Sequence, residues 1–311
     1  MSAIKVENIS KSFGKTKALD GVSFEVARGE LFGLIGPDGA GKSTLFRLLT
    51  TLLNPDFGRA EVDGFDIVKE YRDIRKRVGY MPGRFSLYQD LTVEENLNFF
   101  AALFGVKVED TYDLVAPIYR QIEPFKTRKA GKLSGGMKQK LALSCALIHR
   151  PSVLFLDEPT TGVDAVSRSE FWDMLSDLKQ KGITILVSTP YMDETSRCDR
   201  IALCNEGRIL SINTPKDIVS GFNSHSQNSS PNPVPTTLYA ISAENMYQLL
   251  LSSRKCKGVV ECYPFGEMHH LVVDETFDIE CFKKELTDMK GLRIEPINPT
   301  IEDMFIKLMK Q

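Results

Sequence analysis

The feature that most constrains this chain is the glycine-rich segment at residues 36–44, which reads GPDGAGKST and fits G-x-x-x-x-G-K-[ST]. A short apolar run at residues 31–35 predicts a strand before it, and residues 43–53 predict a helix after it. Glycines let a backbone curl around phosphate oxygens, and the positive end of the following helix faces the anion. This phosphate loop therefore predicts a nucleotide-binding α/β fold.

The residues of the phosphate loop have different expected parts in binding. Lys42 is expected to reach the β- and γ-phosphates, and Ser43 to ligate Mg²⁺. The predicted cofactors are thus ATP and Mg²⁺. The candidate nucleotide-binding residues of the loop are Gly36, Asp38, Gly39, Gly41, Lys42, Ser43 and Thr44.

A second polar position follows the apolar run at residues 153–156, where two carboxylates end a predicted strand. Asp157 is expected to hold Mg²⁺ through water, and Glu158 to polarise the attacking water. Two acids at an ordinary strand end are the alternative. The phosphate loop upstream favours the catalytic interpretation, with Glu158 as the catalytic residue.

A second glycine-bearing segment, LSGGMKQ at residues 133–139, precedes a predicted helix at residues 140–149. Ser134 is a good helix N-cap, and Gly135 and Gly136 permit close backbone approach. This makes a second anion-binding helix start. One chain does not need two such starts for one triphosphate, whereas a dimer that sandwiches ATP does.

Composition restricts the partners of this chain of 311 residues. Its formal net charge of −2 gives no electrostatic case for nucleic acid as the main partner. No apolar stretch approaches the roughly 18 residues that cross a bilayer, and the first twelve residues are polar. We therefore expect a cytoplasmic protein whose membrane role runs through a partner. The six cysteines are scattered, which predicts reduced thiols.

The order of elements predicts two domains. Continuous apolar runs at residues 31–35, 153–156 and 183–187, separated by helices, indicate a mostly parallel sheet covered on both faces. We place this α/β domain at residues 1–219 and a polar, proline-containing linker at 220–237. Residues 238–311 form a small α+β domain, because strands and helices there follow the ferredoxin-like order βαββαβ before a last helix at 301–310.

The order of phosphate loop, LSGGMKQ, LDEPTTGVD and a strand ending in VST resembles the ABC transporter ATPase family over residues 1 to about 215. The resemblance implies a P-loop NTPase domain with a RecA-like core sheet, an antiparallel β subdomain and a helical subdomain. It implies that Phe13 stacks on adenine, that Asp164 lies in a loop crossing to another monomer, and that residues 80–88 face a permease.

The tail at residues 299–305, PTIEDMF, resembles that of exporter ATPases whose permease is a separate chain. This resemblance implies drug, lipid or polysaccharide efflux. The implied partners are membrane permease subunits and a second ABC ATPase chain, alike or different. The implied location is the inner face of the cell membrane, held there by the permease.

Two positions depart from the family pattern. Gly83 stands where the family has a glutamine that contacts Mg²⁺ and the attacking water, and Pro190 where it has a histidine that grips the γ-phosphate. Our hypothesis is a heterodimer in which this chain holds ATP at a slow site and lends residues 134–136 to a faster one. The alternative is a fully active homodimer, with water, Tyr191 or Gln89 compensating.

Roles outside transport are also open to an ABC protein. A ribosome-acting relative usually carries two cassettes, and only one is present here. A DNA-repair relative needs a long coiled coil between the phosphate loop and LSGGMKQ, and the gap is far too short. A nucleotide-gated regulator without a transport role remains the third option.

Overall fold

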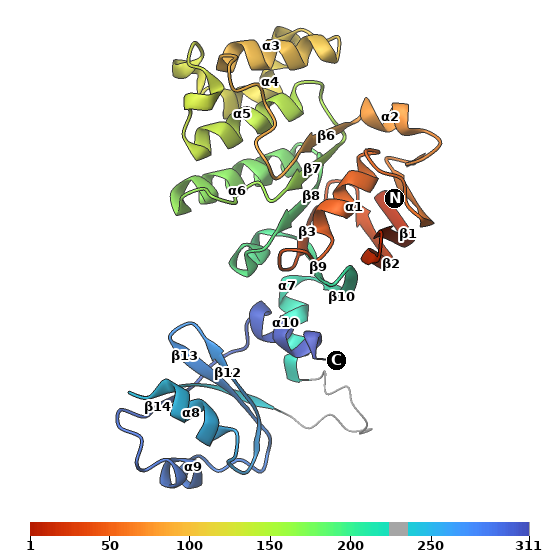
Figure 1. Cartoon of the computed structure of the whole chain (residues 1–311). Coiled ribbons are helices and arrows are strands. Elements are labelled where there is room, and N and C mark those ends of the chain that lie inside the picture. The colour runs from red at the N-terminus through yellow and green to blue at the C-terminus, as the bar shows by residue number, and fades with distance from the viewer. Residues whose placement is uncertain (224–235, 311) are drawn as a thin grey trace. The chain divides into compact units, whose positions relative to one another are not determined.

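The computed structural model describes residues 1–223 and 236–310, and the chain divides into two compact units, Met1–Pro215 and Lys216–Gln311 (Figure 1). Most of the linker predicted at residues 220–237 lies outside the described residues. Each unit has its own hydrophobic core.

A six-stranded sheet organises the first unit, in the order β10-β9-β3-β8-β7-β6. All neighbours pair in parallel except β10 with β9. Every residue of β3, β7 and β8 is buried, as a parallel sheet covered on both faces requires. The predicted, mostly parallel sheet is confirmed. Its strands are β3 (Leu31–Ile35), β6 (Val78–Met81), β7 (Val153–Asp157), β8 (Thr184–Thr189), β9 (Arg200–Asn205) and β10 (Arg208–Asn213).

An antiparallel sheet, in the order β2-β1-β4-β5, shares one core with the parallel sheet and α1 (Lys42–Leu49). Along β2, Val22, Phe24 and Val26 are buried while the residues between them are exposed, so one face points into the core. The strands are β1 (Ser2–Phe13), β2 (Thr16–Ala27), β4 (Phe57–Val62) and β5 (Phe65–Asp66), followed by the short helix α2 (Tyr71–Arg75).

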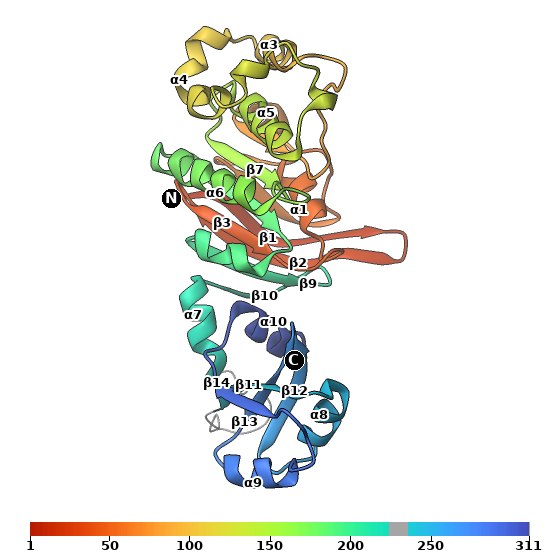
Figure 2. The same ribbon diagram turned by 90° about the vertical axis from the view of Figure 1, so that its left-hand side faces the viewer.

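The third part of this unit is helical. Figures 1 and 2 show α3, α4 and α5 gathered together, apart from β1 and β2, while α1 and α6 cover opposite faces of the parallel sheet. The predicted RecA-like core, antiparallel β subdomain and helical subdomain are therefore confirmed. The bounds are α3 (Val93–Leu103), α4 (Val108–Tyr119), η1 (Glu123–Phe125), η2 (Ala130–Lys132), α5 (Gly135–Leu147), α6 (Ala165–Gln180) and η3 (Met192–Arg197).

Two helices next to the predicted site differ in extent from the sequence prediction. The helix expected at residues 43–53 ends at Leu49, because Thr51 adopts a left-handed φ of 63° and its carbonyl accepts a hydrogen bond from Arg75 at 2.8 Å. The helix expected at residues 140–149 begins earlier, at Gly135, because the Ser134 side chain caps it there.

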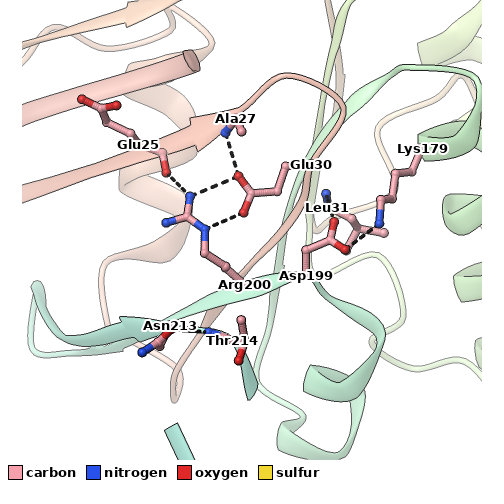
Figure 3. A network of polar contacts seen from close by, with 9 residues as sticks. All are labelled: Glu25, Ala27, Glu30, Leu31, Lys179, Asp199, Arg200, Asn213 and Thr214. Carbon is pink, nitrogen blue, oxygen red and sulfur yellow. Dashed lines mark hydrogen bonds and ion pairs between the residues drawn. The ribbon is translucent and has the colours of Figure 1, made fainter. Parts of the chain in front are cut away.

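A polar network fixes the amino ends of β3 and β9 (Figure 3). The Arg200 guanidinium donates to both carboxylate oxygens of Glu30, at 2.7 and 3.1 Å. The Leu31 amide donates to Asp199, which also pairs with Lys179. This network lies where β3 begins. The phosphate loop follows the other end of the same strand.

The second unit confirms the ferredoxin-like prediction. Its four strands pair antiparallel in the order β12-β13-β11-β14, and two helices follow the first and third strands along the chain. The helix expected at 279–289 is shorter and ends at Glu285. The bounds are α7 (Pro215–Ser220), η4 (Gly221–Asn223), β11 (Thr237–Ser242), α8 (Met246–Ser253), β12 (Val259–Phe265), β13 (Met268–Val273), α9 (Ile279–Glu285), β14 (Arg293–Pro296) and α10 (Ile301–Met309).

Asp303 of the PTIEDMF tail is fully buried and accepts hydrogen bonds that hold the tail in place. One carboxylate oxygen accepts from the Tyr263 hydroxyl at 2.7 Å and from His270 Nδ1 at 2.5 Å. The other accepts from the amide and hydroxyl of Thr300, which forms a capping box at the start of α10. One carboxylate thus fastens α10 to β12 and β13.

Asp303→Ala is therefore expected to weaken the second unit by about 3 kcal/mol, because it leaves buried donors without a partner. Hydrogen-exchange mass spectrometry of α10 and β12 measures this loss as faster exchange, by about a hundredfold at that energy. Asp288→Ala, an exposed change after α9, is the matched control. Equal protection in both variants would contradict the role given to Asp303.

The same carboxylate predicts a pH dependence. Burial alone would raise the pKa of Asp303, but hydrogen bonds from His270, Thr300 and Tyr263 outweigh it and hold that pKa below its usual value. The resulting stabilisation is complete above the unfolded pKa of about 3.9 and is lost as the pH falls through the folded pKa. Protection of α10 should therefore decline below about pH 4, and less steeply in Asp303→Ala.

Candidate nucleotide-binding site

The phosphate loop runs from the buried end of β3 to the first turn of α1. Gly41 precedes α1 with a φ of 93°, a conformation that glycine adopts without strain. A Cβ at Gly36 would lie 2.2 Å from the carbonyl oxygen of Cys204, so only glycine fits there. These two glycines hold the loop in a tight curl over the positive end of α1, which fits a phosphate group.

Lys42 lies inside this curl, with 4% of its surface exposed. Its Nζ donates to the carbonyl oxygens of Gly36 at 2.8 Å and Pro37 at 3.0 Å. The same Nζ lies 3.2 Å from Glu158 Oε1. The ammonium group therefore brings together the phosphate loop and the acidic strand end, two segments that the sequence places more than a hundred residues apart.

The two acids at the end of β7 are positioned by Ser188 of β8, a residue that the sequence analysis did not select. The Ser188 hydroxyl donates to Asp157 Oδ1 at 2.7 Å and accepts from the Glu158 amide at 3.0 Å. Glu158 adopts a left-handed φ of 49°, unusual for a residue other than glycine. The pairing of β7 with β8 is the signal that could have pointed to Ser188, because Asp157 and Ser188 are register partners in these two strands.

Gly83 lies directly against this acidic pair. A Cβ built on it would be 3.1 Å from the carbonyl oxygen of Asp157 and 3.8 Å from the Cβ of Glu158. Pro190 follows the last residue of β8. Neither residue has a side-chain donor, so Gly83 offers no polar side chain beside Glu158 and Pro190 offers none after the end of β8.

The two suggested substitutes for the missing side chains have other neighbours. The Arg168 guanidinium lies over the ring of Tyr191, 5.0 Å from its centroid. The carbonyl of Gln89 accepts from the Gly131 amide within the helical subdomain. Neither of these contacts involves Glu158. They therefore do not support the interpretation that Tyr191 or Gln89 replaces the missing side chains.

The loop after β8 is also held by a residue that sequence reasoning missed. Glu194 is buried and accepts from the Thr189 hydroxyl at 2.6 Å and the Thr160 hydroxyl at 3.1 Å. Thr160 follows the acidic pair along the chain, and Thr189 precedes Pro190. Glu194 thus ties the segments after β7 and β8 to each other.

The LSGGMKQ segment and Asp164 form a second group of predicted residues. The Ser134 hydroxyl accepts from the Met137 amide at 3.4 Å and begins α5. Asp164 accepts from the Ser167 amide at 3.0 Å and begins α6, and this backbone bond lowers its pKa. A Cβ at Gly136 would lie 2.7 Å from the Ser167 hydroxyl oxygen. Two helix starts therefore meet at Gly136.

Phe13 ends β1 and is 48% exposed, with Lys11 Nζ 5.8 Å from its ring centroid. An exposed ring near a short β-turn is free to stack on a planar group. The structure thus leaves the predicted adenine contact sterically possible.

A groove of about 600 Å³ opens beside the segment at residues 80–88. Its lining includes the apolar side chains of Met81, Phe85, Phe100 and Leu103. Cationic side chains also line it, namely Arg75, Lys76 and Arg84. The groove therefore combines an apolar contact surface with positive charge.

Comparison with known proteins now decides the family. The ABC transporter family matches residues 19–161. Nod factor export ATP-binding protein I of Rhizobium sp. (strain N33) is 34% identical over 309 residues, covering 98% of this chain and 96% of that protein. The chain belongs to the family of ABC transporter ATP-binding proteins.

Two further similarities concern the first unit of this ABC chain. The probable multidrug ABC transporter ATP-binding protein YbhF of Escherichia coli (strain K12) is 42% identical over 219 residues. That match covers 70% of this chain but only 38% of the relative. A dimeric, post-hydrolysis ATP-binding cassette, MJ0796 bound to ADP and phosphate, aligns with a TM-score of 0.61 at 25% identity, covering 68% of this chain and 98% of that one.

Within residues 1–223 and 236–310, none of the helices combines the length and the apolar character needed to span a bilayer.

Proposed function

We propose that this chain is the ATP-binding subunit of a membrane exporter and that its own nucleotide site hydrolyses ATP slowly. The observation that carries the proposal is the place of Gly83 against the Asp157–Glu158 pair. A side chain there would face the acid that activates water, and glycine supplies none. Pro190 removes a second donor at the end of the neighbouring strand, and losing one preorganised donor lowers a rate by about a hundred- to a thousandfold.

Binding is assigned to the residues that curl around the anion. The phosphate loop, residues 36–44, holds the phosphates, Lys42 neutralises them, and Phe13 stacks on the base. Ser43 and Asp157 hold Mg²⁺, a role that suits hydroxyl and carboxylate oxygens. When bound, ATP supplies the phosphoanhydride bond, and Mg²⁺ neutralises negative charge on its phosphates. Glu158 orients and deprotonates water, and its backbone is fixed for this by Ser188.

The two helix starts that meet at Gly136 are assigned to a partner. We infer that residues 134–136 and Asp164 complete the ATP site of a second ABC ATPase chain, since the dimeric relative pairs two such cassettes. ATP-driven closure of this dimer then drives transport. In a heterodimer, the partner's phosphate loop carries the faster site. Residues 1–219 act as the ATP-binding domain, and residues 238–311 as an accessory domain.

Purification of the chain alone tests the slow site. We expect tight Mg²⁺-dependent ATP binding with hydrolysis far below about 1 s⁻¹, the lower end of typical enzyme turnover. Turnover near that value and abolished by Glu158→Gln would overturn the slow site and support the active homodimer. Purification of the native complex then identifies the second ATPase chain, and finding only copies of this chain would contradict the heterodimer.

The groove beside residues 80–88 is assigned to the permease, which places the chain at the inner face of the membrane. Leu103 lines this groove and is 64% exposed. Leu103→Glu should reduce permease subunits in the purified native complex by at least about tenfold, the loss expected for one buried apolar contact. Phe57→Glu, at a 73% exposed position on β4, is the matched control.

The groove experiment also separates transport from regulation. A native complex without any membrane subunit, in the unaltered protein as well as in both variants, would favour the nucleotide-gated regulator. Loss of the permease in Phe57→Glu and Leu103→Glu alike would show that the effect does not come from the groove.

A further inference from the structure

The left-handed backbone of Glu158 needs support from its surroundings. A φ of 49° is unfavourable for a residue with a side chain, and such a conformation persists only where neighbouring contacts fix it. On the amino side, the Glu158 amide donates to both the hydroxyl and the carbonyl oxygen of Ser188, at 3.0 and 3.1 Å. The carboxyl side of Glu158 is fixed by a different set of contacts.

Residues 158–161 form a tight turn on that side. The Thr161 amide donates to the Glu158 carbonyl oxygen at 3.2 Å and closes the turn. Pro159 stands at its second position, which proline favours in β-turns. Thr160 stands at its third position and is only 1% exposed. The residue that holds the buried side chain of Thr160 therefore restrains the whole turn.

Glu194 of η3 is that residue. Its Oε2 accepts from the Thr160 hydroxyl at 3.1 Å and from the Thr189 hydroxyl at 2.6 Å. The Thr189 oxygen in turn accepts from the Tyr191 amide at 3.1 Å, which anchors the carboxylate to the end of β8. Because Glu194 is 95% buried, these charge-assisted hydrogen bonds are shielded from water and are strong.

The two oxygens of Glu194 have different surroundings. Oε1 has no hydrogen-bond partner within the described residues, and Arg168 Nη1 lies 3.9 Å from it. The same guanidinium lies 3.8 Å from Asp193 and over the ring of Tyr191. Arg168 thus offsets the buried charge at a distance, while Oε2 alone joins the two threonine hydroxyls.

We propose that Glu194 is a positioning residue for ATP hydrolysis, which holds the turn after Glu158 so that the Glu158 carboxylate faces the attacking water. The inference rests on the proposed function, in which Glu158 activates water. Two consecutive residues of β8 then fix both sides of Glu158. Ser188 contacts its amide directly, and Thr189 acts on the following turn through Glu194. The phosphate loop that binds ATP is a separate segment, so loss of Glu194 should slow hydrolysis without weakening binding.

Single-turnover hydrolysis of γ-labelled ATP by an excess of the full chain, with Mg²⁺, tests the proposal. Glu194→Leu removes both oxygens and should lower the rate by at least about tenfold, since a misplacement of an ångström costs up to about a hundredfold. Glu194→Gln keeps an oxygen that accepts from both hydroxyls and should stay within about fivefold of the unaltered rate. Isothermal titration should give ATP affinities within about threefold of the unaltered chain for both variants.

Two threonine variants separate the hydrogen bond from a general disturbance. Thr160→Val removes only the hydroxyl through which Glu194 reaches the turn, and should slow hydrolysis about as much as Glu194→Leu. The combined variant should be no slower than either single variant, because both break the same contact. Thr195→Val is the matched control, since it removes another buried hydroxyl of η3 that donates to the Met192 carbonyl instead, at 2.6 Å.

The outcomes distinguish this role from the proposed function. If Glu158→Gln slows hydrolysis and Glu194→Leu does not, Glu158 keeps its role and that of Glu194 is overturned. A rate in Glu194→Gln as low as in Glu194→Leu has the same meaning, as does a loss of ATP affinity in Thr160→Val that matches its loss of rate. If the unaltered chain hydrolyses ATP no faster than Glu158→Gln, the proposed role of Glu158 fails, and that of Glu194 fails with it.

Discussion

Lys42→Ala is expected to weaken ATP binding by at least about a hundredfold, or roughly 2.7 kcal/mol, because two charge-assisted hydrogen bonds to phosphate oxygens are lost. The ammonium group is buried in the curl of the phosphate loop, where its three close acceptors are the carbonyls of Gly36 and Pro37 and the carboxylate of Glu158. An anion entering this curl meets a positive charge that is 4% exposed. Isothermal titration with Mg²⁺ and ATP measures the change.

The control for Lys42→Ala must remove the same charge elsewhere in the first unit. Lys181→Ala does so at an exposed residue just after α6 and should leave the affinity within about twofold, since charges beyond a Debye length are screened. A loss of less than about tenfold in Lys42→Ala would mean that the loop binds phosphate mainly through its amides and helix dipole.

The phosphate loop could be predicted from sequence because its determinants are local. Glycines at fixed spacing, a preceding apolar strand and a following helix all occur within one short segment, and the structure places Gly36, Gly41 and Lys42 in one curl. The caps at Ser134 and Asp164 are equally local, as each accepts from an amide three residues later. The ferredoxin-like unit followed from the order of short strands and helices alone.

The parts that sequence could not predict depend on contacts between distant segments. Ser188 of β8 bonds to the acidic pair at the end of the neighbouring strand β7, and Glu194 joins the segments after β7 and β8. Ser188 belongs to the VST strand end, but that motif does not predict its contact with the acids, and Glu194 belongs to no motif. The early end of α1 likewise depends on Arg75, a residue of α2 that reaches back to Thr51. Such contacts appear only once the register of the parallel strands is known.

Restoring the family residues at positions 83 and 190 should have the second large effect, an increase in ATP turnover. Gly83→Gln with Pro190→His is expected to raise ATP turnover of the isolated chain by at least about tenfold, because one polar group returns beside Glu158 and a second returns after the end of β8. Gly83 does not occupy the left-handed region, so its backbone accepts a side chain. The site is tight, with a Cβ 3.1 Å from the Asp157 carbonyl oxygen, so a shift of a few tenths of an ångström is required.

A matched double variant isolates the returned side chains from the change in backbone. Gly83→Ala with Pro190→Ala adds the same Cβ at position 83 and removes the same proline ring, but supplies no donor. If this control accelerates turnover as much as the restored pair, the gain comes from the loosened loop after β8, which Thr189 and Glu194 hold in place. Adding Glu158→Gln to the restored pair should return turnover to the background rate, because the donors can act only through a water that Glu158 activates.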